Sequence, residues 1–262
     1  MSYVVGLALI SAVFVAAEAL RPWRPQQPQL RRGLFSDLLF LVFNGHFLGV
    51  GLYFVATRAV LPHVDTALRS VGAYPYVYRN AAAGWPTWVQ ALVLVIGFDF
   101  LQWAIHRLLH AVPWLWQFHK VHHSVVDGEM DWIVSFRFHW VEAVVYKTLQ
   151  YLPLAFFGFG ATPVLIQAFL GTAVGHLNHS NLDVGHGRWR YILNSPRMHL
   201  WHHDADGPAK NFGIIFSVWD WLFGTAHLPA RAPARIGFAE VAELPPGFIR
   251  RSLWPLWRAR DA

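Results

Sequence analysis

Apolar residues in this chain are concentrated in five long runs, separated by shorter polar stretches. Tyr3–Leu20 is nearly all apolar, and Glu18 is its only charged residue. Residues 35–61 form a second run that is long enough to cross a bilayer as a helix, and Pro62 is expected to end it. Residues 85–110 form the third run. Because backbone in lipid must satisfy its own hydrogen bonds, the pattern predicts an all-α integral membrane bundle.

The fourth and fifth runs cover residues 138–158 and 162–176. They are separated by residues 158–163, a turn-forming stretch with two glycines and a proline. The pair is therefore either two further spans or a hairpin that does not fully cross. In total, about four spanning segments are expected in a multi-pass protein.

The placement of arginines predicts how the bundle is oriented. Four arginines follow the first run, which has no basic start, so a retained membrane helix is expected rather than a signal peptide. The loop that carries them should be cytoplasmic, and residues 63–84 should face the other side. The third run then ends on the cytoplasmic side. Residues 111–134 and 180–229, which are more polar, are expected to form a cytoplasmic helical cap.

Composition supports the membrane interpretation. Hydrophobic residues make up 55% of the 262 residues and charged residues only 14%, against about 25% in soluble domains. The net charge of +6 comes from basic residues that flank apolar runs, which indicates contact with membrane lipids and not with nucleic acid. No linker or repeat divides the chain, so residues 1–262 are expected to form one domain. Residues 240–262 are expected to be a basic interfacial tail, or alternatively a disordered one.

Ten of the fifteen histidines fall into four tight clusters, each beside an apolar run. Imidazole is a strong ligand for iron, copper and zinc. On a helix, the two HxxHH triplets can supply nitrogens to two metals or enclose one. The predicted metal ligands are His106, His110, His119, His122, His123, His176, His179, His199, His202 and His203.

The number of histidines and the lack of cysteine restrict the kind of metal site. The absence of cysteine excludes thiolate-bound zinc, iron–sulfur clusters and thiolate-bound haem within this chain. Ten imidazoles exceed the four ligands that zinc takes. Two iron ions that keep open positions for O2 are favoured, although recombinant protein could carry zinc, which lies above ferrous iron in the affinity order.

Some polar residues near the clusters are candidates for orienting a ligand. Asp99 lies seven residues before His106, so it could accept the second ring N–H of a histidine, or it could only line a helix-packing seam. His139 and Glu142 are spaced to form a pair that supports the site or is merely structural. The other histidines are expected to be structural or exposed: His46, His63, His186 and His227.

Between residues 98 and 225 the chain resembles the fatty acid hydroxylase superfamily, also called the sterol desaturase family. The first matching motifs are Asp99-Phe-Leu-Gln-Trp-Ala-Ile-His106-Arg-Leu-Leu-His110, Trp116-Gln-Phe-His119-Lys-Val-His122-His123-Ser124 and Arg137-Phe-His139. The later ones are His179-Ser180-Asn181, Asn194-Ser-Pro-Arg-Met-His199-Leu-Trp-His202-His203, Asn211-Phe-Gly213, and Trp219-Asp220 through Phe223-Gly-Thr225. Trp140 and His186 depart from the family pattern, which often has proline at these positions.

The resemblance implies a membrane enzyme with a histidine-ligated pair of iron ions. Such enzymes activate O2 and hydroxylate or desaturate lipid-like substrates, and the histidine clusters match their ligand motifs. Asn211 and Asp220, within the later motifs, are expected to support the site together with the candidates above. The chain has no His-Pro-Gly-Gly haem motif and no ferredoxin cysteines. Electrons would therefore come from a separate ferredoxin or cytochrome-type donor with its reductase.

Other functions remain open from the sequence. A membrane acyl desaturase or alkane hydroxylase also uses histidine motifs, but the nine-residue spacing from His110 to His119 fits the hydroxylase family better. A zinc-dependent membrane hydrolase and a non-catalytic metal-binding protein are further alternatives. Sterol, fatty acyl, carotenoid, ether-lipid and hopanoid-like substrates all remain possible, as do both hydroxylation and desaturation.

Aromatic residues near the clusters predict a largely apolar substrate pocket that opens sideways into the membrane. The alternative is that they serve as interfacial anchors and core packing. The candidates for the lining are Trp103, Trp132, Phe136, Phe138 and Trp140.

Overall fold

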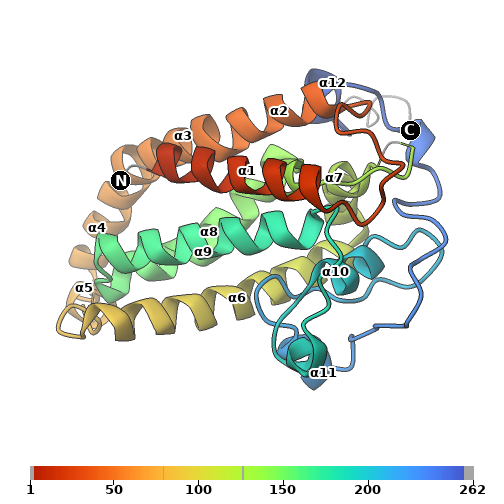
Figure 1. Cartoon of the computed structure of the whole chain (residues 1–262). Coiled ribbons are helices and arrows are strands. Elements are labelled where there is room, and N and C mark those ends of the chain that lie inside the picture. The colour runs from red at the N-terminus through yellow and green to blue at the C-terminus, as the bar shows by residue number, and fades with distance from the viewer. Residues whose placement is uncertain (1–2, 79, 126, 257–262) are drawn as a thin grey trace.

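The computed structural model describes residues 3–78, 80–125 and 127–256, and within these ranges it contains helices but no β-strand. The long helices lie side by side (Figure 1). The bundle consists of α1 (Tyr3–Leu20), α2 (Leu34–Val42), α3 (Leu48–Val55), α4 (Leu61–Ser70), α6 (Thr87–Ala111), α8 (Trp140–Phe157) and α9 (Ala161–His179). The remaining helices are α5 (Tyr74–Val77), α7 (Pro113–His123), α10 (Pro196–His202), α11 (Val218–Leu222), α12 (Phe248–Ser252), and the 3₁₀ turns η3 (Trp132–Phe136), η4 (Gly187–Tyr191) and η5 (Val241–Glu243). The helices α7, α10, α11 and α12 and most loops are gathered at one end of the long helices, and α5 lies at the other. The predicted all-α bundle is confirmed.

Three helical stretches of the described chain are long and apolar enough to cross a membrane: Tyr3–Leu20, Leu34–Ser70 and Thr87–Ala111. In the first two, only 11% of the residues in the most apolar segment are buried. Their apolar side chains therefore face outwards, where lipid would solvate them. The fourth and fifth runs form α8 and α9, which are joined by a tight turn at Gly158, whose φ of 72° favours glycine.

The second helix does not end at Pro62, so that prediction was wrong. Helix continues from α2 through α4 to Ser70, with two π-helical segments, η1 (Phe43–Phe47) and η2 (Ala56–Val60). The N–H of Leu61 bonds to the carbonyl of Ala56, five residues earlier. Proline disturbs a regular helix because it lacks an N–H and its ring meets the carbonyl four residues back. The wider π turn directly before Pro62 accommodates it.

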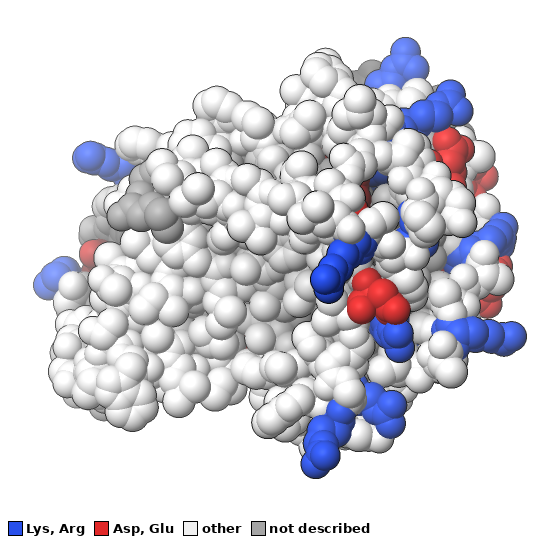
Figure 2. All heavy atoms as spheres, in the orientation of Figure 1, with Lys and Arg blue, Asp and Glu red and all other residues white. Residues whose placement is uncertain are grey.

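Charged side chains are unevenly distributed over the visible face of the molecule. They gather at the end where α7, α10, α11 and α12 lie, and the surface of the long helices is almost free of them (Figure 2). A few charges appear at the opposite end, near α4 and α5. This distribution fits an apolar belt in the bilayer between two polar ends.

A network of buried charges, which the apolar pattern does not predict, connects the N-terminal helices to the cap. Arg31 lies between two carboxylates, 2.7 Å from Asp131 and 2.6 Å from Asp37. Asp37 also binds Arg137 at 3.0 Å. All four residues are buried. Two of the four arginines used to predict orientation, Arg31 and the half-buried Arg24, thus bind the protein and not the lipid surface.

The basic tail expected over residues 240–262 is described as far as residue 256, and the last six residues lie outside the described ranges. Its helix α12 packs onto α2, with the ring of Phe248 4.8 Å from that of Phe40. Arg251 is buried and donates to the carbonyl of Pro245. Ile249 is exposed on the other side. The described part of the tail is therefore folded against the bundle.

Candidate metal centre

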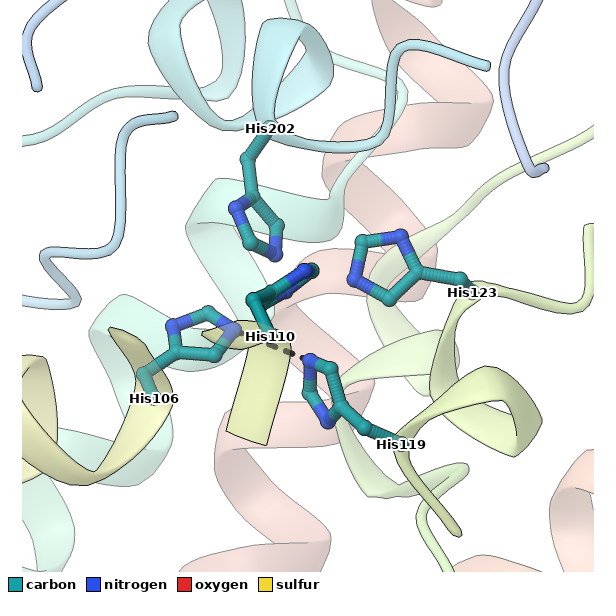
Figure 3. A group of neighbouring side chains, drawn as sticks. All are labelled: His106, His110, His119, His123 and His202. Atoms are coloured by element: carbon teal, nitrogen blue, oxygen red, sulfur yellow. Dashed lines mark hydrogen bonds between the residues drawn. The ribbon is translucent and has the colours of Figure 1, made fainter. Parts of the chain in front are cut away.

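Nine histidines converge in two groups at the cap end of the bundle. In each group the potential ligand atoms all lie within 4.8 Å of one another. The five-histidine group contains His106, His110, His119, His123 and His202, whose rings point towards one another (Figure 3). The four-histidine group contains His122, His179, His199 and His203.

Helical geometry divides the two HxxHH triplets between the groups. Successive residues on an α-helix are rotated by about 100°, so the first and last members of HxxHH share a face and the middle one does not. On α7, His119 and His123 face the five-histidine group and His122 faces the other. The triplet that begins in α10 does the reverse, because His202 alone joins the five-histidine group. Of the two arrangements that the spacing allows, the structure has the divided one.

Backbone carbonyls fix the orientation of four histidine rings. A carbonyl can only accept a hydrogen bond, so each Nδ1 that faces one must carry the proton. The Nε2 of the same neutral ring then presents a lone pair to the centre of its group. The four contacts are His106 to Phe212 O (2.9 Å), His122 to Arg137 O (3.2 Å), His179 to Gly175 O (2.7 Å) and His202 to Lys210 O (2.8 Å).

A carboxylate plays the same part for a fifth ring. The Nδ1 of His119 lies 3.0 Å from a carboxylate oxygen of Glu142, and both side chains are buried. Glu142 belongs to the first turn of α8. The two atoms are close but not aligned as a hydrogen bond. A carboxylate in this position favours a proton on Nδ1, and such partners are common around metal-binding histidines.

Ring nitrogens from neighbouring histidines of a group approach one another to hydrogen-bond distance. The Nε2 atoms of His122 and His179 are 3.1 Å apart, and those of His106 and His119 are also 3.1 Å apart. The Nδ1 atoms of His122 and His179 both face carbonyls and carry the protons, so neither Nε2 of this pair can donate to the other and two lone pairs face each other. Further buried ring nitrogens have no hydrogen-bond partner: Nε2 of His110, His123 and His202, and both nitrogens of His203. These donor sets fit one metal ion in each group.

Burial keeps the histidines of the cap in the form that binds metal. Removal from water lowers the pKa of His122, His123, His199 and His203 well below the usual value, and neighbouring histidines lower it further. The same causes lower the pKa of His202 to about 3. Neutral imidazole is the ligating form, so these rings are ready to coordinate at neutral pH.

The tenth predicted ligand, His176, belongs to neither group. It is completely buried, and its Nδ1 lies 2.8 Å from the hydroxyl of Ser135. Its Nε2 lies 3.2 Å from the hydroxyl of Ser11 on α1. Both ring nitrogens thus have protein partners. His176 ties α9 to α1 and to η3, three residues before the inward-facing His179.

Asp99 contacts a loop instead of orienting a histidine. Its carboxylate accepts hydrogen bonds from the backbone N–H groups of Ile215 and Phe216, at 2.7 and 2.9 Å, and from the indole of Trp219. The carboxylate on α6 therefore holds residues 215–219 against this helix. Of the two roles considered for Asp99, the structure favours the packing role.

Asp220 and Asn211 support the site through the backbone. Asp220 accepts from the N–H groups of Phe212 and Gly213, at 2.9 and 2.8 Å, and so helps to place the Phe212 carbonyl that binds His106. Asn211 donates to the carbonyls of Met198 and His227. It directly follows Lys210, whose carbonyl binds His202. Every residue has a backbone carbonyl, so the sequence could not show which carbonyls bind the histidine rings.

His139 and Glu142 do not pair with each other. His139 caps the start of α8, where its Nδ1 accepts from the N–H of Val141. Glu142 turns instead towards His119. The remaining histidines, His46, His63, His186 and His227, lie outside both groups.

A cavity of about 260 Å³ extends from the two histidine groups into the bundle. Phe136 and Phe138 line it as predicted, but Trp103, Trp132 and Trp140 do not. These three indoles pack elsewhere: Trp103 donates to Asp220, Trp140 donates to the carbonyl of Ser252, and Trp132 lies against His176. The lining is largely apolar, as predicted, although several side chains with amide or hydroxyl groups contribute to it.

Several known proteins are similar to this chain in sequence. Ornithine lipid hydroxylase OlsE of Rhizobium tropici is 34% identical over 182 residues, which cover 66% of this chain and 54% of that protein. An alkylglycerol monooxygenase of Xenopus tropicalis is 26% identical over 172 residues (62% and 37%), and cholesterol 25-hydroxylase-like protein 2 of Danio rerio is 28% identical over 200 residues (63% and 65%). The matches thus span between about a third and two thirds of these relatives. No solved structure matches the chain.

The family profile described as fatty acid hydroxylase matches residues 91–225, which is just over half of the 262 residues. This segment begins seven residues before the region expected from the motifs and ends at the same residue. It contains all nine histidines of the two groups. The chain therefore belongs to the fatty acid hydroxylase family.

Proposed function

We propose that this protein is a membrane-bound, O2-dependent oxygenase that uses two iron ions to hydroxylate, or desaturate, an unactivated C–H bond of a lipid-like substrate. One observation carries the proposal: paired bare Nε2 atoms of buried histidines border a cavity that enters the membrane bundle. Two of the relatives named above, an ornithine lipid hydroxylase and an alkylglycerol monooxygenase, support the same class of reaction.

Each residue of the site has a definite part in this proposal. The five- and four-histidine groups would each hold one iron ion, and the pair would supply the activation of O2 that C–H cleavage requires. Glu142 and the four backbone carbonyls keep the ligand nitrogens unprotonated and pointed inwards. Phe136 and Phe138 line the cavity beside the histidines and exclude water from it.

The proposal also covers where the reaction takes place and what supplies its electrons. The polar end that holds the histidines would face the cytoplasm, as the remaining exposed arginines after α1, Arg21 and Arg32, suggest. A separate ferredoxin or cytochrome-type donor with its reductase would deliver electrons there. The lipid substrate would enter sideways from the bilayer and need not cross water.

Lipid mass spectrometry of cells tests the proposal directly. Cells that express the protein should contain one lipid class that has gained an oxygen atom or lost two hydrogens. Cells that express an equal amount of a His203→Ala variant should lack that product, because the variant removes a histidine from the four-histidine group. Identical lipid profiles in the two strains, under aeration and with iron supplied, would contradict the proposed function.

A further inference from the structure

The largely apolar cavity carries a small set of polar side chains away from the histidines. Three glutamines line it beyond the histidines, on three different helices: Gln102 on α6, Gln150 on α8 and Gln167 on α9. Gln102 precedes His106 by four residues, so it lies one turn, about 6 Å, further along the helix. Gln150 lies eight residues beyond Glu142, about 12 Å along α8.

Hydrogen bonds within the protein use only some of the donors and acceptors of these three carboxamides. Gln150 donates to the side-chain oxygen of Gln102 at 2.6 Å. A carboxamide can donate two hydrogen bonds and accept two. Among the described residues, nothing else binds the amide N–H₂ of Gln102 or the carbonyl oxygen of Gln150. Gln167 makes no hydrogen bond to any part of the described chain.

Hydrogen bonding between helices explains the positions of only two of the three glutamines. Glutamine side chains do join helices in bilayers, which would account for the contact between Gln102 and Gln150. It would not account for Gln167, which faces the same cavity without such a contact. Unpaired amides are costly in a medium without water. A ligand that carries its own polar group would supply the missing partners.

We propose that these three residues form a glutamine collar that binds an uncharged hydrogen-bonding group of the lipid substrate, such as a hydroxyl or an amide. The collar would then decide which carbon reaches the histidines, because it fixes the substrate one to two helical turns from them. The substrate class is thus a long apolar molecule with such a group along its length, and not a plain hydrocarbon. This inference rests on the proposed function and specifies its substrate.

An anionic group is the main alternative for the same cavity, since Lys147 also lines it. Lys147 is largely exposed on α8, whereas Gln150 is buried and Gln102 and Gln167 are half-buried. Three carboxamides that both donate and accept match a neutral group better than a carboxylate, which only accepts. We therefore assign a neutral group as the ligand of the collar, and the experiment below includes a carboxylate as the alternative.

Binding measurements on the full chain, loaded with redox-inactive zinc in lipid nanodiscs, separate this inference from turnover. The probes are radiolabelled palmitamide, hexadecane and palmitate, which share one chain length. We expect palmitamide to bind best, and Gln167→Leu or Gln150→Leu to weaken it by about three- to tenfold, as expected for one lost hydrogen bond. Zinc content should stay unchanged. Gln167→Leu removes no hydrogen bond within the described fold, so its result does not depend on damage to the bundle.

The matched control is Gln117→Leu, the same substitution at a half-buried glutamine of α7 that does not line the cavity. It should leave palmitamide binding as in the unmodified protein. Equal binding of palmitamide and hexadecane, or full palmitamide binding by both collar variants, would overturn the inference. The inference would also be overturned if palmitate bound more tightly than palmitamide and the Lys147→Met variant lost this binding. Because zinc supports no oxidation, these outcomes are independent of whether the protein is an oxygenase.

Discussion

His179→Ala should remove one metal ion per chain and abolish turnover, whereas His176→Ala should keep both ions. The two residues lie on the same helix, three positions apart, but only His179 belongs to a histidine group. Both nitrogens of His176 already bind serine hydroxyls. Removing a group that hydrogen-bonds to a metal ligand typically lowers metal affinity by about 10–100-fold. Removing a ligand itself, such as His179, should lower it at least as much.

Metal content per folded chain, measured by elemental mass spectrometry after purification, decides this prediction. His63→Ala is the control for histidine loss in general, because His63 lies on α4, outside both groups. It should change neither metal content nor turnover. If His176→Ala lost one ion as completely as His179→Ala does, the assignment of nine ligands to two groups would be wrong.

Asp37→Asn should destabilise the protein by about 3–5 kcal/mol, the usual cost of leaving a buried charge without its partner. One oxygen of Asp37 binds both Arg31 and Arg137, at 2.6 and 3.0 Å. All three side chains are withdrawn from water. The carbonyl of Arg137 also binds His122, so we expect the variant to hold the metal of the four-histidine group more weakly as well.

Denaturant unfolding of the protein in mild detergent measures this effect, and Asp183→Asn provides the control. Asp183 forms a similar ion pair with Arg197, but both side chains are about half exposed. Such surface pairs contribute between zero and about 1 kcal/mol. Equal, small effects of the two substitutions would show that the buried network does not stabilise the fold.

The pattern of apolar runs predicted most of the fold, and its errors have physical causes. The runs correspond to the long helices because hydrophobic length alone determines which segments lipid can solvate. The pattern failed at Pro62, where a π turn that leaves no sequence signal lets the helix continue. It also treated Arg31 as a surface residue, because charge partners 100 residues away cannot be read from local sequence.

Side-chain positions in the candidate site were predictable where helical spacing determines them. They were not predictable where the tertiary fold determines them. The HxxHH triplets place their nitrogens by the rotation of the helix, so their division between two groups was among the expected arrangements. His176 matched the spacing of a ligand but is turned towards Ser11 and Ser135 by the packing of α9 on α1 and η3. Likewise, packing sends Trp103 away from the cavity to Asp220.

The most direct test of the account is to follow the oxygen atom. The purified, iron-loaded protein is placed in membranes made from lipids of the cells that express it. A chemical or enzymatic reductant and isotopically labelled O2 are then added. We expect one labelled oxygen atom to enter a lipid when the product is an alcohol, or labelled water to form as a lipid loses two hydrogens. Oxidation in the absence of O2, or a lipid oxygen that comes from labelled water instead, would contradict it.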